Sequence, residues 1–179
     1  MMQQQCKYSR LQMAALLSLR FVTGWHILYE GIVKFLTPNW TSVNFLSESQ
    51  WILSGFADWI TSNSNILSAV DFLNTWGLMA IGLGIIVGMF AREAAVVGAI
   101  LVFIYYLNTP PLIGIEYSIP TDGNSLIVNK TLIEAIALSV LALFPTSKSF
   151  GIDFFLRKGK GINSDKPREV AESAKSLQS

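Results

Sequence analysis

Cysteine and histidine are almost absent from this chain. Cys6 is the only cysteine and His26 the only histidine among 179 residues. A single cysteine excludes an intrachain disulfide, a CxxC redox pair and a cysteine-held cluster within one chain. A single histidine excludes a haem with two histidine ligands from the same chain, and no His, Cys and carboxylate spacing typical of zinc or di-iron sites occurs. We therefore expect no metal ligands and no covalently bound cofactor.

Charge is also scarce. Charged residues make up 14% of the sequence and hydrophobic residues 51%, with a mean hydropathy of +0.45 and a net charge of +1. Soluble domains usually carry about 25% charged residues. The composition therefore predicts an all-α, polytopic membrane protein in contact with lipid. Since the basic residues do not gather on one face, it does not predict a nucleic-acid partner.

Long apolar stretches predict a bundle of four transmembrane helices. Between the first two stretches, residues 40–71 are too polar to span a membrane. Their apolar positions approximate helical spacing, and tryptophan is enriched at membrane interfaces, so this first loop predicts short interfacial helices; the alternative is a compact extramembrane cap. We expect one membrane domain over residues 1–156, with spans at about 11–36, 72–90, 94–109 and 126–144.

Lysine and arginine are missing from two of the connections. Residues 37–71 and 108–125 contain acidic but no basic residues, whereas ten lysines and arginines lie before the first span, in the 90–93 turn and in the tail. Basic residues favour the cytoplasmic side. We therefore expect a multi-pass protein of the cell (inner) membrane with both termini cytoplasmic. The first ten residues predict a short cytoplasmic lead, and residues 157–179 a basic, mobile cytoplasmic tail.

The first span carries four ionisable residues. At 100° per residue, they share about one third of the helix circumference, and the opposite side is apolar. Charges inside a membrane cost about 2.5–3.5 kcal/mol each on insertion scales, so they usually face a protein interior or a wet cavity. This helix therefore needs partners for Arg20, His26, Glu30 and Lys34.

The fourth span carries a matching set near its outer end, namely Asn129, Lys130 and Glu134. With the expected topology, the acids and bases of the two spans lie at similar depths. We expect crossed ion pairs, Glu30 with Lys130 and Lys34 with Glu134, or one network with Asn129 and His26 at its edge.

Two interpretations of this cluster stay open. It is either a set of salt bridges that fixes the register of the bundle, or an outward-facing pocket for a polar head group or a small anion. In the second case the catalytic candidates are His26, Glu30 and Glu134, and the substrate-binding candidates are Arg20, Lys34, Asn129 and Lys130. Arg20 could equally bind a backbone carbonyl. Five aromatic residues could form the sides of an aromatic slot there, although aromatic residues at helical spacing mostly serve packing. They are Trp25, Tyr29, Trp76, Tyr105 and Tyr106.

At GWHILYEGIVKF (24–35) and NKTLIEAIALSVLALFP (129–145) the sequence resembles the DoxX/DoxD family of small four-span membrane proteins. The matching features are Arg20 early in the first span, the run from Gly24 through Gly31 to Lys34, and the start of the last span. The first outer loop, with PNWTS at 38–42, resembles the DoxD-like branch, the small subunit of thiosulfate:quinone oxidoreductase. The resemblance covers about residues 8–156.

This resemblance implies a membrane subunit of a respiratory oxidoreductase that passes electrons from thiosulfate or another reduced sulfur compound to membrane quinone. It also implies a second oxidoreductase subunit, with quinone as a substrate. Fold does not fix function, so two alternatives remain. One is a non-catalytic scaffold or accessory subunit of a redox or stress-response complex. The other is a small-solute permease, which would need a homo-oligomer, for example through Gly84 and Gly88.

Overall fold

The computed structural model describes residues 9–112, 114–118 and 126–144, and all the regular structure in these residues is helical. The tail predicted at 157–179 lies outside them. The helices are α1 (Arg10–Leu36), α2 (Val43–Ser47), α3 (Ser54–Thr61), α4 (Ser64–Val87), α5 (Ala91–Asn108) and α6 (Lys130–Leu143).

Three of the described helices are long and apolar enough to cross a membrane: α1, α4 and α5. The bounds of α1 and α5 agree closely with the first and third predicted spans. Helix α4, which corresponds to the second predicted span, begins at Ser64, eight residues before the predicted start. Helix α6 has 14 residues and rises about 21 Å, whereas a membrane core is about 30 Å thick. The helices therefore support a membrane protein, and a bundle of four spans is not confirmed.

Local sequence signals explain where these helices begin and end. Ser9 caps α1 in a reciprocal pair with Gln12, and Pro38 holds Thr37 in the extended region, which ends the helix. Asn63 caps α4 by accepting from two backbone N–H groups. This cap explains the early start of α4, because it lets the polar residues 64–71 continue the helix that the apolar run alone did not predict.

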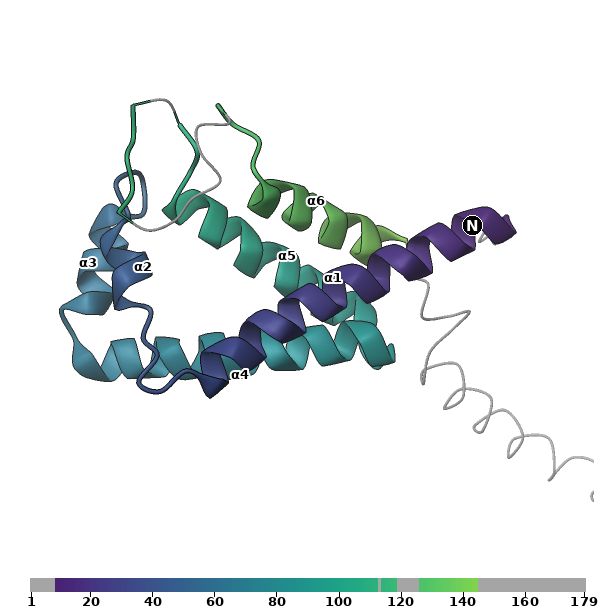
Figure 1. The fold of residues 1–179 in the computed structure, drawn as a ribbon, viewed down its shortest axis with the longest axis horizontal. Helices are drawn as coiled ribbons and strands as arrows, with labels where there is room; N and C mark the ends of the chain where they lie inside the picture. The colour runs from purple at the N-terminus through teal and green to yellow at the C-terminus, as the bar shows by residue number, and fades with distance from the viewer. Residues whose placement is uncertain (1–8, 113, 119–125, 145–179) are drawn as a thin grey trace, which may run out of the picture.

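The four long helices form two pairs, α1 with α4 and α5 with α6 (Figure 1). Contact between α1 and α6 is sparse by comparison. One buried apolar cluster joins the pairs, with a member or more from each long helix: Ile27, Leu78, Ile81, Ile85, Val102, Ala135 and Leu138. A second cluster, of Ala95, Leu141 and Ala142 with Leu19 packed against it, joins them nearer the α4–α5 turn. The region near Lys34 and Lys130 is left to be filled by other side chains.

Glycines bring α1 and α4 into close contact. A Cβ atom at Gly82 of α4 would lie 2.5 Å from the Leu28 backbone nitrogen of α1, and one at Gly31 would lie 2.9 Å from the Met79 nitrogen. Such positions tolerate no side chain, because the obstacle is backbone. Gly84, one of the predicted small positions, instead faces Ala94 of α5, where a Cβ would lie 3.2 Å from the Ala94 Cβ.

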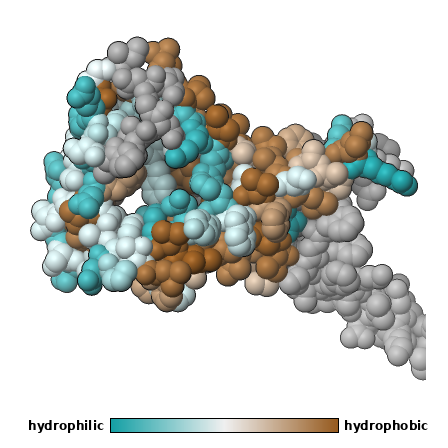
Figure 2. All heavy atoms as spheres, viewed as in Figure 1, coloured by the Kyte–Doolittle hydropathy of each residue, from teal (hydrophilic) through white to brown (hydrophobic). Residues whose placement is uncertain are grey.

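Residues 37–63, which we call the cap, close the end of the molecule at which α1 ends and α4 begins. They contain α2 and α3, so the predicted short helices are confirmed. Figure 2 shows hydrophilic side chains gathered around this end and hydrophobic ones along the long helices. The Asp71 carboxylate of α4 accepts from the Ser42 backbone N–H and hydroxyl, and Asn108 of α5 donates to the Phe45 carbonyl at 2.7 Å. The cap is therefore tied to both helix pairs.

Candidate functional site

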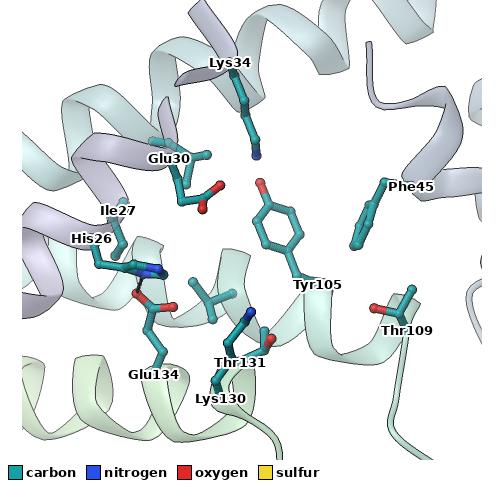
Figure 3. A pocket seen from close by; sticks show the side chains of 12 residues that line it. His26, Ile27, Glu30, Lys34, Phe45, Tyr105, Thr109, Lys130, Thr131 and Glu134 are labelled. Atoms are coloured by element: carbon teal, nitrogen blue, oxygen red, sulfur yellow. Dashed lines mark hydrogen bonds and ion pairs between the residues drawn. The ribbon is translucent and has the colours of Figure 1, made fainter. Parts of the chain in front are cut away.

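A pocket of about 180 Å³ lies between the two helix pairs near the cap. We call it the inner pocket. Figure 3 shows charged side chains from α1 and α6 pointing into it from opposite walls. Its lining combines ionisable, hydroxyl and apolar groups: His26, Ile27, Glu30, Lys34, Phe45, Leu78, Val102, Tyr105, Thr109, Lys130, Thr131 and Glu134. Five of the seven predicted site residues therefore meet in one place.

His26 and Glu134 join the two pairs across this pocket. The His26 Nδ1 lies 2.7 Å from a Glu134 carboxylate oxygen (Figure 3). The imidazole is 51% exposed and the carboxylate 17%. We expected Glu134 to pair with Lys34, but Lys34 lies about two turns beyond His26 on α1 and turns toward α4. A histidine–carboxylate pair of this length can exchange a proton with a bound ligand.

Lys34 is held on the far side of the pocket from Glu134. Its ammonium donates to the Asn74 side-chain oxygen of α4 at 2.8 Å. It also lies 5.0 Å from the centre of the Trp40 ring and 5.2 Å from that of Tyr105. Cations over aromatic faces at such distances are attracted by the ring quadrupole. Lys34 is therefore fixed by three different elements: the start of the cap, α4 and α5.

A second pocket of about 290 Å³ adjoins the inner pocket on the side of the cap. We call it the cap pocket. It is lined by Glu30, Lys34, Trp40, Ser42, Phe45, Asn74 and Tyr105. Four of these residues also line the inner pocket, so they form a shared wall between the two: Glu30, Lys34, Phe45 and Tyr105.

Arg20 lies outside both pockets, although we predicted a substrate-binding role for it. Its side chain is buried, at 5% exposure, and donates to the carbonyls of Ile85 and Ile86. These carbonyls belong to the last turn of α4, where no partner within the helix is available. The arginine therefore caps the C-terminal end of α4 from a neighbouring helix, which is the backbone-carbonyl role left open by the sequence.

Asn129 does not line either pocket, contrary to the substrate-binding prediction. Its side chain accepts from the Leu132 backbone N–H at 2.9 Å and so caps the N-terminus of α6. This cap fixes where α6 begins, which in turn places Lys130 and Glu134 one turn apart on the pocket side. Its contribution to the site is indirect.

Several lining residues were not among the predicted site residues. Asn74 and Phe45 contact the site only because α4 and the cap fold back over α1, which no local pattern announces. Thr131 was adjacent to a predicted residue, and its hydroxyl was overlooked. Tyr105 alone of the five aromatic candidates lines the pockets. One signal in the sequence could have identified Asn74. The Lys34 ammonium needs a hydrogen-bond acceptor, and Asn74 is a polar residue of α4 at a similar depth.

Comparison with protein-family models, with curated proteins and with solved structures finds no match for this chain. The resemblance to DoxX/DoxD proteins therefore stays a prediction. Within the described residues, no group of three or more His, Cys, Asp or Glu side chains could hold a metal ion. The function must be argued from the pockets themselves.

Proposed function

We propose that this chain is the integral membrane component of a respiratory oxidoreductase, passing electrons from a reduced sulfur compound such as thiosulfate to membrane quinone. The observation that carries the proposal is the His26–Glu134 pair on the inner pocket. Reduction of a quinone to a quinol takes up two electrons and two protons. A ligand ring in the pocket would therefore need proton donors within reach, and this pair together with Glu30 supplies them.

The size and lining of the inner pocket favour a single ring as its ligand. Pockets for drug-sized molecules enclose about 300–1,000 Å³, and this one encloses about 180 Å³. Its apolar side, formed by Ile27, Leu78 and Val102, suits the face of a ring. Its polar side, with Lys130 and Thr131, suits ring oxygens that gain negative charge during reduction.

The seam between α1 and α6 offers this ring a route from the lipid. Contact between the two helices is sparse, and half of the His26 side chain is exposed there. The neighbouring Tyr29 of α1 and Ile133 of α6 are exposed, at 54% and 59%. A long apolar tail could therefore stay among the acyl chains while the ring contacts His26 and Glu134.

The membrane topology belongs to the same proposal. Leu126, Ile127 and Val128 are apolar and exposed ahead of α6. They extend the exposed apolar surface of α6 beyond its N-terminus. We infer that residues 126–144 form the fourth crossing of a cell-membrane protein, with the cap outside and both termini cytoplasmic.

Electrons must reach the quinone from outside this chain. Oxidation of two thiosulfate ions to tetrathionate, which joins them by one new S–S bond, would release two electrons, either directly to the quinone or through a cofactor of a second oxidoreductase subunit. The protons would come from His26, Glu30 and Glu134. Lys34 and Lys130 would stabilise negative charge on the reduced ring or on the sulfur donor.

Thiosulfate-dependent quinone reduction tests the proposal. The full chain, in lipid nanodiscs with the product of its neighbouring gene, is assayed with a soluble menaquinone or ubiquinone analogue. His26→Gln removes proton transfer by imidazole and is expected to lower kcat about a hundredfold or more with a smaller change in KM. Glu93→Gln, an acid outside the pockets, is the control and should leave turnover unchanged. Absence of any thiosulfate-dependent reduction by the unaltered protein would refute the proposal.

A non-catalytic scaffold is the second candidate, because the same ion pair is a main link between α1 and α6. A scaffold needs the helices joined but needs no pocket chemistry. The double variant Glu30→Gln, Lys130→Met alters the pocket while leaving His26 and Glu134 in place. A scaffold predicts full activity of the assembled complex with this variant, whereas the oxidoreductase proposal predicts a loss.

A further inference from the structure

The wall between the inner pocket and the cap pocket carries hydrogen-bond donors that no described residue accepts. The Tyr105 hydroxyl is buried beside the Asn74 side chain, and no described residue accepts a hydrogen bond from it. An ammonium has three N–H donors, and among the described residues the Lys34 ammonium donates one hydrogen bond, to the Asn74 side chain. Buried donors in folded proteins nearly always find an acceptor. This wall therefore lacks an acceptor that a ligand can supply.

We propose that the cap pocket binds a small oxyanion, held by the Tyr105 hydroxyl and the Lys34 ammonium. Figure 3 shows these two groups pointing toward one another from α5 and α1. An oxyanion offers acceptors in several directions and carries the charge that the ammonium attracts. Both donors line the cap pocket, whose volume of about 290 Å³ accommodates a tetrahedral ion with some of its water.

The surrounding groups favour an anion over a cation in this position. A cation would have to share the faces of Trp40 and Tyr105 with Lys34, which already lies over both rings. The Asp71 carboxylate beneath the cap is engaged by Ser42 and does not line the pocket. Glu30 does line it and opposes an anion. Neutralising Glu30 should therefore strengthen anion binding.

This inference extends the proposed function by giving the electron donor a site of its own. The sulfur oxyanion would bind on the side of the polar cap, and the quinone ring would bind in the inner pocket beside His26. The shared wall, with Tyr105 and Lys34, would separate the two. The role of the anion as electron donor rests on the proposed function, whereas the binding of an oxyanion does not.

Equilibrium binding of thiosulfate tests the inference. The full chain in nanodiscs of zwitterionic lipid is titrated with sodium thiosulfate at constant ionic strength, with chloride as the reference anion. Tryptophan fluorescence is the readout, because the Trp40 ring lies beside Lys34 and should respond to an anion there. Trp40→Phe should abolish the signal change, which shows that the response comes from the cap pocket.

Two neighbouring tyrosines provide matched variants. Tyr105→Phe removes the donor and keeps the ring, so the dissociation constant should rise about tenfold. Tyr106→Phe removes the same group from the next residue, whose hydroxyl donates to the Ile127 carbonyl outside both pockets, and should leave affinity unchanged. Glu30→Gln should tighten binding severalfold. Absence of saturable binding, or equal effects of the two tyrosine variants, would overturn the inference.

A lipid phosphate could supply the same oxyanion chemistry as a free ion. Nanodiscs containing phosphatidylglycerol distinguish the two sources: unchanged thiosulfate affinity supports the free ion, and competition assigns the site to a head group and overturns the donor role. The proposed function fails separately. If thiosulfate binds but quinone is not reduced, the proposed oxidoreductase function is refuted and the oxyanion site stands. If quinone is reduced but thiosulfate does not bind in the cap pocket, only the oxyanion site is refuted.

Discussion

Helices α1 and α4 approach each other closely because glycines at a few positions lack a Cβ atom. At Gly82 a methyl group would meet the backbone of Leu28 at 2.5–2.7 Å, so one of the helices would have to move. Gly77, on the same helix, has nothing within 4 Å of its Cβ position. The two glycines differ in their surroundings and not in their secondary structure, which makes them a matched pair.

We expect Gly82→Ala to destabilise the protein by about 1–3 kcal/mol through overpacking. Gly77→Ala should change stability by less than about 1 kcal/mol, since alanine favours a helix and meets open space. Thermal unfolding in detergent, followed by circular dichroism, measures both. Equal midpoints for the two variants would mean that α1 and α4 do not pack as described.

Arg20 illustrates a residue whose role is structural despite its charge. It supplies donors to two carbonyls at the end of α4. We expect Arg20→Met to cost about 1.5–3 kcal/mol, the usual range for hydrogen bonds to a charged group. Thiosulfate affinity should not change in the fraction that remains folded. A loss of thiosulfate affinity without a loss of stability would mean that Arg20 takes part in binding after all.

At the residue scale, the sequence predicted five of the residues that line the inner pocket, but it paired Glu134 with the wrong residue of α1. The 3.6-residue period places His26, Glu30 and Lys34 on one face, and the structure confirms that they line one pocket. The choice between Lys34 and His26 as the partner of Glu134 depends on shifts of a few ångströms between helices. Asn74 is part of the site because the Lys34 ammonium needs a hydrogen-bond acceptor and α4 packs against α1.

For the helices, the length of each apolar stretch predicted that a helix forms, and the capping residues determine where it begins and ends. Helix α1 agrees with the expected span to within a residue, because Ser9 and Pro38 mark both ends. The start of α4 was placed too late, since Asn63 begins a helix in polar sequence. The end of α4 and the start of α5 lie close together, with Gly88 and Phe90 in the left-handed region. Arg92 follows this tight turn, at the start of α5.

The expected topology can be tested with single cysteines on a Cys6→Ser background. Glu116→Cys, in a connection without basic residues, should react with a membrane-impermeant maleimide on intact cells. Arg92→Cys, at the start of α5, should react only after the membrane is opened. Both side chains are exposed, so accessibility to the reagent depends on the side of the membrane alone. The reverse labelling pattern would invert the proposed orientation.

For the whole molecule, the two helix pairs are joined at mid-length and nearer the α4–α5 turn, which leaves space near the cap that charged residues line. Composition predicted a helical membrane protein, and the two clusters of ionisable residues predicted a pocket where the inner pocket lies. The division into an inner and a cap pocket could not be predicted, because it depends on how Phe45 and Tyr105 meet between the cap and α5. Their rings lie 5.5 Å apart, edge to face.

Photoaffinity labelling with a tailed quinone that carries a photoreactive group on its ring shows whether a quinone ring occupies the inner pocket. We expect labelled peptides from α1 around His26 and from α6 around Glu134, suppressed by excess unlabelled quinone and weakened by His26→Gln. Labelling spread over lipid-facing residues such as Phe72 and Ile100, and insensitive to competition, would contradict this expectation.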